Sequence, residues 1–147
     1  METGSPGEDG GVNPNPRELV GRWQLRRRIR DRLLGAYGTV TGELIVTPDG
    51  DGLRWDEQGL LWWAGVERPV TRTYLLRPGA DGWQVRFADG SPFHPWLPGR
   101  RVIHPCRADV YTGLVAVDPD RVRTLWDVRG PRKDQRLVTR FDRVGGQ

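Results

Sequence analysis

Apolar and polar residues alternate along most of this chain, with the period of two that is typical of a β-strand buried on one face. In residues 21–30 one face carries Trp23, Leu25, Arg27 and Ile29, and the other carries Gln24, Arg26, Arg28 and Arg30. In residues 122–128 one face carries Val122, Thr124, Trp126 and Val128. Strands are therefore predicted to be the main element.

Further strands are predicted over residues 37–47, 53–58, 60–65, 69–77, 83–88, 108–117 and 136–144. Turn signals rich in Gly, Pro and Asp separate several of them, at residues 48–52, 78–82, 118–120 and 130–134. No segment predicts a helix of three turns. About eight to nine antiparallel strands at this spacing indicate a sandwich or a barrel.

A residue pattern at the two ends of the chain favours the barrel. Gly21 and Trp23 lie on the first strand and Arg140 lies on the last. First and last strands are neighbours in an up-and-down barrel, so the Arg140 guanidinium would stack on the indole of Trp23 and close one end. Gly-x-Trp followed by a late arginine resembles lipocalin and calycin barrels. The fold class is therefore predicted to be all-β, a single antiparallel up-and-down barrel.

The amino-terminal segment, residues 1–16, is Gly, Pro, Asn and acid with almost nothing apolar, and it is predicted to be a disordered tail before a barrel domain over residues 17–147. No apolar run is long enough for a transmembrane helix, and no signal-peptide pattern is present. A single cysteine excludes an intramolecular disulfide. A cytoplasmic location is the simplest interpretation.

Arginine makes up almost all of the basic side chains, since the chain has 23 Lys and Arg residues and Lys133 is its only lysine. Such a bias suits phosphate or nucleic-acid binding, but a GC-rich genome also favours arginine. The net charge is only +4, and acidic residues are interspersed. Neither a nucleic-acid nor a membrane partner is therefore predicted, and a homodimer is compatible with the sequence.

The irregular stretch over residues 87–113 holds both histidines, His94 and His104, and the only cysteine, Cys106. Imidazole and thiolate suit zinc, but the spacing matches no compact zinc motif. No metal site and no cofactor are predicted; zinc at these three residues and haem through one histidine are the alternatives.

Asp109 and Tyr111 are two residues apart and share one face of their strand, with His104 just upstream. As a catalytic set, Asp109 or His104 would take a proton while Tyr111 donates to an oxyanion. The alternative is a satisfied network with Arg101 or Arg107. The turn at 130–134 would aim Arg132 and Lys133 over the barrel mouth, where they would hold an anionic group.

Three segments, over residues 87–94, 104–111 and 126–134, resemble the motif blocks of an uncharacterised bacterial family of unknown function that is described as calycin-like. The similarity spans residues 19–144, with Gln135 where an aromatic residue is expected. The resemblance implies the barrel and the grouping of the three segments, but no reaction.

The leading hypothesis is a barrel that binds a small, partly apolar ligand with an anionic or carbonyl group. The predicted ligand-binding residues are His94, His104, Asp109, Tyr111, Trp126, Arg132 and Lys133. A cofactor-independent isomerase, cyclase or lyase using Asp109, Tyr111 and His104 is one alternative. A filled barrel that acts as a protein-interaction module is the other.

Overall fold

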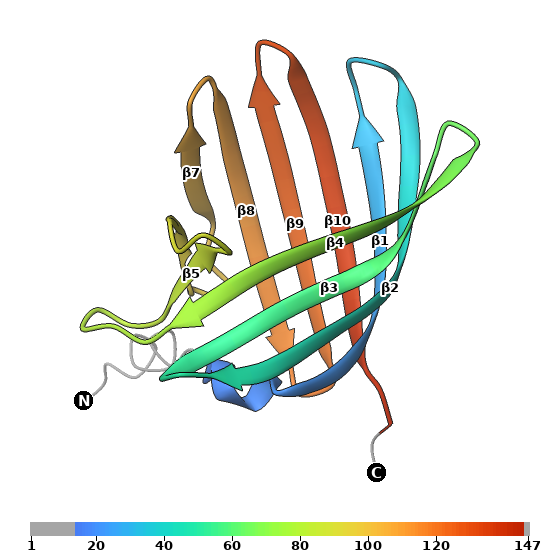
Figure 1. Cartoon of the computed structure of the whole chain (residues 1–147). Helices are drawn as coiled ribbons and strands as arrows, with labels where there is room; N and C mark the ends of the chain where they lie inside the picture. The colour runs from blue at the N-terminus through green and yellow to red at the C-terminus, as the bar shows by residue number, and fades with distance from the viewer. Residues whose placement is uncertain (1–13, 146–147) are drawn as a thin grey trace, which may run out of the picture.

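The computed structural model describes residues 14–145, which form ten β-strands and one short 3-10 helix (Figure 1). The helix, η2, spans Pro16–Leu19. The first five strands are β1 (Gly21–Asp31), β2 (Ala36–Asp49), β3 (Gly52–Trp63), β4 (Val66–Arg77) and β5 (Gln84–Phe87). The others are β6 (Pro92–Pro95), β7 (Val102–Cys106), β8 (Asp109–Asp118), β9 (Arg121–Gly130) and β10 (Lys133–Arg143).

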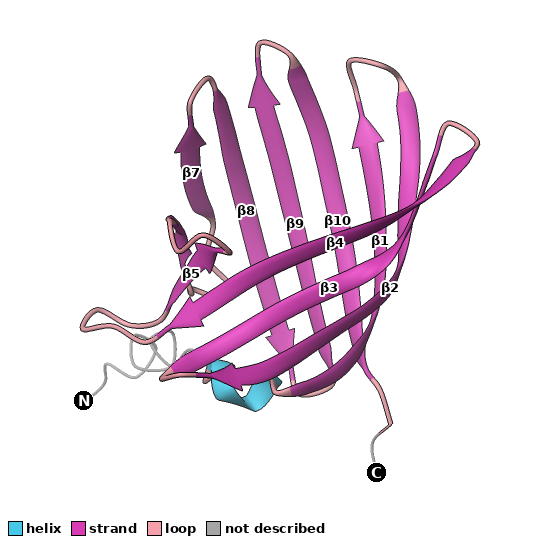
Figure 2. Ribbon diagram, viewed as in Figure 1, coloured by secondary structure: helices cyan, strands magenta, loops and turns pink. Residues whose placement is uncertain are grey.

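The strands form one antiparallel sheet in the order β6-β5-β4-β3-β2-β1-β10-β9-β8-β7. Because β1 pairs with β10, the first and last long strands are neighbours, as predicted. The sheet curls on itself and nearly closes, with its two edges at β6 and β7 (Figure 2). The prediction of an all-β antiparallel barrel is confirmed, with ten strands where about eight to nine were expected.

The additional strands come from the irregular stretch. Its prolines exclude a central strand, and both β6 and β7 lie at sheet edges, where a missing backbone donor is tolerated. By contrast, the two strands predicted over 53–58 and 60–65 are one strand, β3. Gly59 stays in the ladder opposite Gly42 of β2, and the two backbones approach so closely that a Cβ at either position would collide. Glycine here lets the sheet bend without interrupting it.

One end of the barrel is closed by η2, which lies beneath the strands (Figure 2). Asn15 caps this helix by accepting a hydrogen bond from the Arg17 amide, and Leu19 is buried. The fully buried Trp23 donates its indole hydrogen to the Leu19 carbonyl at 2.9 Å. This short helix therefore seals the apolar core at that end of the barrel.

The arginine that stacks on Trp23 is Arg143, so the prediction of Arg140 is wrong. Arg143 pairs with Trp23 in the β1–β10 register and places its guanidinium carbon 4.2 Å from the indole centroid. It also donates to the carbonyls of Glu18, Val20 and Pro119. Arg140 lies on the outward face, because it alternates with the buried Phe141 and Thr139, and it binds Asp142 in solvent.

These two arginines give a matched test of how the barrel end is held. Arg143→Ala is expected to lower the free energy of unfolding by about 2–3 kcal/mol, because it removes the cation–π contact and leaves backbone carbonyls unpaired. Arg140→Ala removes only an exposed ion pair and should cost less than about 1 kcal/mol. Urea denaturation of both variants checks the difference, and equal losses would contradict a special role for Arg143.

Of the predicted tail over residues 1–16, residues 1–13 lie outside the described part of the chain. Pro14 accepts a hydrogen bond from the Trp96 indole at 3.1 Å, and Pro16 is buried in η2. Within residues 14–145, no helix has the length and apolar character needed to cross a bilayer.

Candidate functional site

The interior of the barrel is hollow. Three adjoining cavities occupy it, with volumes of about 50, 130 and 380 Å³. Two residues, Arg72 and Leu137, line all three cavities, so the cavities meet at mid-depth. The alternative of a filled barrel is therefore wrong as far as the interior is concerned.

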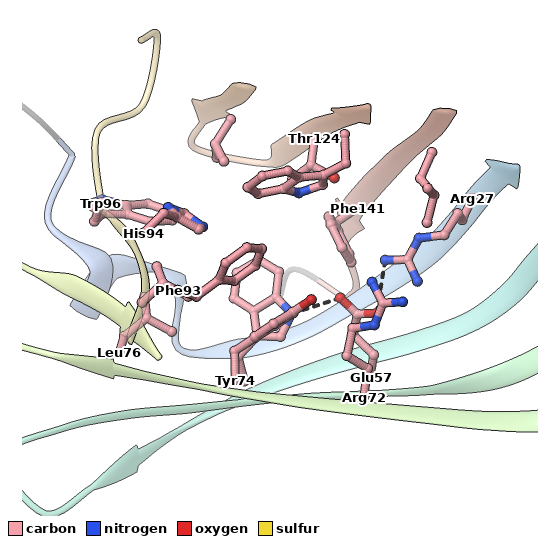
Figure 3. A pocket seen from close by; sticks show the side chains of 15 residues that line it. Arg27, Glu57, Arg72, Tyr74, Leu76, Phe93, His94, Trp96, Thr124 and Phe141 are labelled. Carbon is pink, nitrogen blue, oxygen red and sulfur yellow. Dashed lines mark hydrogen bonds and ion pairs between the residues drawn. The ribbon is translucent and has the colours of Figure 1, made fainter. Parts of the chain in front are cut away.

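The deepest cavity has mostly apolar walls. They are built by inward-facing positions of most strands and by Trp96, which follows β6: Trp55, Leu76, Val85, Phe93, Trp96, Val115, Trp126, Leu137 and Phe141. The polar groups on its wall are few, and Figure 3 shows Arg27, Glu57 and Arg72 together on one side, with His94 and Trp96 on the other. An apolar cavity with a few convergent polar groups is the usual form of a small-molecule site.

A buried ion pair holds one side of this cavity. Arg27 of β1 donates to Glu57 of β3 at 2.9 Å and to the Thr139 hydroxyl at 2.7 Å. The second Glu57 oxygen accepts from the Trp55 indole at 2.9 Å. Both charged side chains are under a tenth exposed, but each has its partners, so this pair is electrically neutral and satisfied.

Arg72 of β4 is the positive charge that this pair does not neutralise. It faces Glu57 across the β3–β4 ladder, and Tyr74 faces Trp55 two positions along. Among residues 14–145, no carboxylate oxygen lies within 4.0 Å of the Arg72 guanidinium. Two guanidinium groups and one carboxylate thus leave the cavity with one excess positive charge. Arg72 is itself exposed to solvent, because the cavity opens to water.

The protonation states around Arg72 follow from its surroundings. Burial acts to lower the pKa of the Arg72 guanidinium, but Tyr74 and Glu57 outweigh it and raise that pKa above its usual value. Burial also raises the pKa of the Tyr74 phenol, against the opposing effect of Arg72. At neutral pH the site therefore presents a charged guanidinium beside a neutral hydroxyl, which is a donor set for an anion.

His94 supplies a neutral imidazole to the deep cavity. Burial lowers its pKa, and nearby His104 lowers it further, although a hydrogen bond to the Pro95 carbonyl opposes both. Since that carbonyl can only accept, Nδ1 must carry the proton over the 2.7 Å contact. Nε2 of the neutral ring is then left as an acceptor.

An aromatic cluster joins the deep cavity to the mouth. Phe93 stacks on Trp126 with ring centroids 4.9 Å apart, and on Phe87 at 4.5 Å. The edge of Phe93 meets Tyr111 at 6.2 Å and His104 at 5.2 Å. His104 thus supports the cluster from behind and lines none of the three cavities, whereas Tyr111 and Trp126 line the upper one.

The predicted rim residues pair with one another. Lys133 lines the upper cavity, and its Nζ lies 3.6 Å from a carboxylate oxygen of Asp109. Asp109 faces Gly130, where any side chain would collide with its carboxylate, and it lines none of the three cavities. Arg132 lies exposed in the β9–β10 turn. The rim therefore carries a neutralised lysine.

Of the seven predicted ligand-binding residues, the structure brings four to the cavity walls: His94, Tyr111, Trp126 and Lys133. Cys106 is exposed, and among residues 14–145 no three His, Cys, Asp or Glu side chains are grouped to hold a metal, so His94, His104 and Cys106 do not form a metal cluster in this structure. The sequence reasoning missed the polar residues of the deep cavity, which are Arg27, Glu57, Arg72 and Tyr74. The sequence signal that could have found two of them is their position in the alternation. Arg27 lies on the same strand face as Trp23 and Leu25, and Glu57 lies on the same face as Trp55.

Comparison with known proteins adds a family. A search of curated proteins returned no match. The model of a family of unknown function, DUF6314, matches residues 19–143, which is nearly all of the barrel. This agrees with the resemblance seen in the three motif segments, all of which supply residues to the cavity walls, among them His94, Tyr111 and Trp126. The chain therefore belongs to the DUF6314 family, whose function is unknown.

Proposed function

We propose that this barrel binds a small, partly apolar molecule that carries one negative charge, and that it holds the anionic group at Arg72 and Tyr74 inside the barrel. One observation carries the proposal: Arg72 is a charged group at the meeting point of three cavities, with no carboxylate partner among residues 14–145. Arg72 is exposed to the solvent of the cavity, so the anionic group of a ligand would take the place of water at its guanidinium.

The other cations near the cavity have partners of their own. Arg27 is neutralised by Glu57 at 2.9 Å, and Lys133 by Asp109 at 3.6 Å. The anionic group is therefore seated deeper than the rim position expected for Arg132 and Lys133. An ion pair formed at mid-depth is partly desolvated and is stronger than one at the mouth.

The apolar part of the ligand has room on either side of Arg72. The upper cavity, of about 380 Å³, falls within the range usual for small-molecule sites. The deep cavity below it adds about 50 Å³. Its walls are aromatic and aliphatic, and His94 adds an acceptor for a hydroxyl or amide hydrogen of the ligand. Because Asp109 pairs with Lys133 and lines none of the three cavities, the arrangement supports binding rather than acid–base catalysis by Asp109 and Tyr111.

The proposal can be tested with two fluorescent probes that share an apolar body and differ in charge. Anilinonaphthalene sulfonate is a monoanion, and N-phenylnaphthylamine is its uncharged counterpart. The native protein is expected to bind the anionic probe at least about tenfold more tightly, since a partly desolvated charged hydrogen bond contributes roughly 1.5–3 kcal/mol. Equal affinities would contradict an anion seat, and failure to bind either probe would contradict an accessible cavity.

A further inference from the structure

Two leucines protrude into solvent from the β1–β2 turn at the mouth of the barrel. Leu33 is 57% exposed and Leu34 is 72% exposed, the highest value among the large apolar side chains of residues 14–145. Figure 1 shows this turn at the same end as the β7–β8 and β9–β10 turns, opposite η2. These adjacent leucines at a loop tip bury less than half of their surface within the chain, which makes them candidates for contact with a partner.

The turn is held in place by polar contacts on its inner side. The buried Asp31 carboxylate accepts hydrogen bonds from the Leu34 amide at 3.0 Å and from the Gln135 side chain at 3.3 Å. The Arg32 amide donates to the Asp134 carbonyl at 2.8 Å, and its guanidinium pairs with the Asp134 carboxylate. These contacts fix the turn, so the two leucines point outward from an ordered loop.

The strand that leads into this turn carries a stripe of cations. Arg26, Arg28 and Arg30 alternate on the outward face of β1, all exposed, and no carboxylate oxygen among residues 14–145 lies within 4.0 Å of them. Most other outward arginines of the neighbouring strands are paired: Arg136 with Asp127, and Arg121 and Arg140 with Asp142. The free positive charge on this wall is therefore concentrated on β1, next to the leucine tip.

We propose that this tip docks the barrel, mouth first, on an anionic phospholipid surface. Leu33 and Leu34 would enter the interface, while Arg28 and Arg30 face lipid phosphates within about a Debye length of the surface. Cations alone would suit a nucleic acid equally well, but a phosphate backbone offers no apolar phase for two leucines, so the combination favours a bilayer. The proposal revises the expectation of no membrane partner, which rested on the low net charge of +4 and the interspersed acidic residues. It does not depend on the identity of the cavity ligand.

Sedimentation with lipid vesicles tests this docking. The full chain is expected to bind vesicles of two-thirds phosphatidylcholine and one-third phosphatidylglycerol, and to bind pure phosphatidylcholine at least tenfold more weakly. Arg28→Gln with Arg30→Gln should weaken binding by about 30-fold, at about a factor of five for each basic residue near the surface. Leu33→Ser with Leu34→Ser should weaken it by at least about tenfold.

Matched controls lie elsewhere on the barrel. Arg121→Gln with Arg123→Gln removes the same charge at the opposite end, and Ile103→Ser removes an apolar side chain that is 63% exposed on β7, four strands from β1. Neither should change vesicle binding more than about twofold. The proposal is overturned if the protein does not bind the anionic vesicles, or if the controls weaken binding as much as the tip variants. It is also overturned if the protein binds a fluorescent oligonucleotide more tightly than the anionic vesicles and the double variant Arg28→Gln with Arg30→Gln loses that binding.

The proposal of an anion site in the cavity and the proposal of membrane docking at the leucine tip can be tested separately. Arg72→Met should leave vesicle binding unchanged, because Arg72 lines the interior. Leu33→Ser with Leu34→Ser should leave the affinity for anilinonaphthalene sulfonate unchanged, because neither leucine lines a cavity.

Discussion

Arg72→Met is expected to weaken the binding of anilinonaphthalene sulfonate about tenfold and to leave the binding of uncharged N-phenylnaphthylamine within about threefold. Arg72 is exposed to the solvent of the cavity, so the loss is that of a charge-assisted hydrogen bond, about 1.5 kcal/mol, rather than that of a fully desolvated pair. Methionine keeps much of the length and apolar contact of the arginine stem, so the cavity walls are preserved. Fluorescence titration of both probes with wild-type and variant protein measures the two ratios.

Lys133→Met is the matched control, because Lys133 also lines the upper cavity but already pairs with Asp109. It should lower the affinity for the anionic probe by less than about threefold, since its charge is half-exposed and neutralised. Arg72→Lys should recover part of the affinity, because it restores the charge without the planar fork. A loss of both probes in Arg72→Met would indicate a collapsed cavity, and no loss of either would place the anion elsewhere.

The barrel could be predicted from the sequence because its signals are local. The period-two alternation and the Gly/Pro/Asp turns depend on residues close in the chain, and they gave the strands of β1, β2, β4, β8, β9 and β10 with ends shifted by a few residues. The joining of β1 to β10 followed from one end-to-end pattern. The same pattern did not identify the arginine that stacks on Trp23. That identity depends on which face of β10 turns inward, and the buried Phe141 and Thr139 show that it is the face of Arg143.

The site was harder to predict because it is assembled across strands. Sequence rarity directed attention to His94, His104, Cys106 and Lys133, and two of these line the cavity. Arg72 is one arginine among 22, and nothing within β4 distinguishes it. Its role appears only when the register sets it opposite Glu57 while Glu57 pairs with Arg27. A charge balance of this kind requires three strands to be aligned, which no single segment specifies.

The reliance on rare residue types also led to an incorrect grouping of residues at the rim of the barrel. Asp109 and Tyr111 share a strand face, as expected from alternation, but Asp109 lies at the end of β8, where the β9–β10 turn brings Lys133 to it. Tyr111, two residues further in, reaches the cavity wall. Position along the strand therefore separates two side chains that alternation alone had grouped.

The second large effect is expected from Glu57→Leu, which should lower the free energy of unfolding by about 3–5 kcal/mol. The substitution leaves the Arg27 guanidinium charged and without a carboxylate in the barrel, and it removes the acceptor of the Trp55 indole hydrogen. Breaking a buried pair at one partner costs more than replacing both partners. Denaturant titration should therefore show the double variant Arg27→Met with Glu57→Leu recovering at least half of the loss.

Glu57 should also have an opposite effect on the ligand. Glu57→Gln keeps an oxygen that can accept from the Trp55 indole, but it raises the excess positive charge of the cavity from one to two. The variant should therefore be less stable by about 2 kcal/mol. It should nevertheless bind anilinonaphthalene sulfonate more tightly, by roughly tenfold. A purely structural pair would lose stability and probe affinity together. If both stability and probe affinity fall in Glu57→Gln, the cavity charge does not select the ligand. If stability falls while affinity rises, Glu57 weakens anion binding at a site whose charge selectivity comes from Arg72.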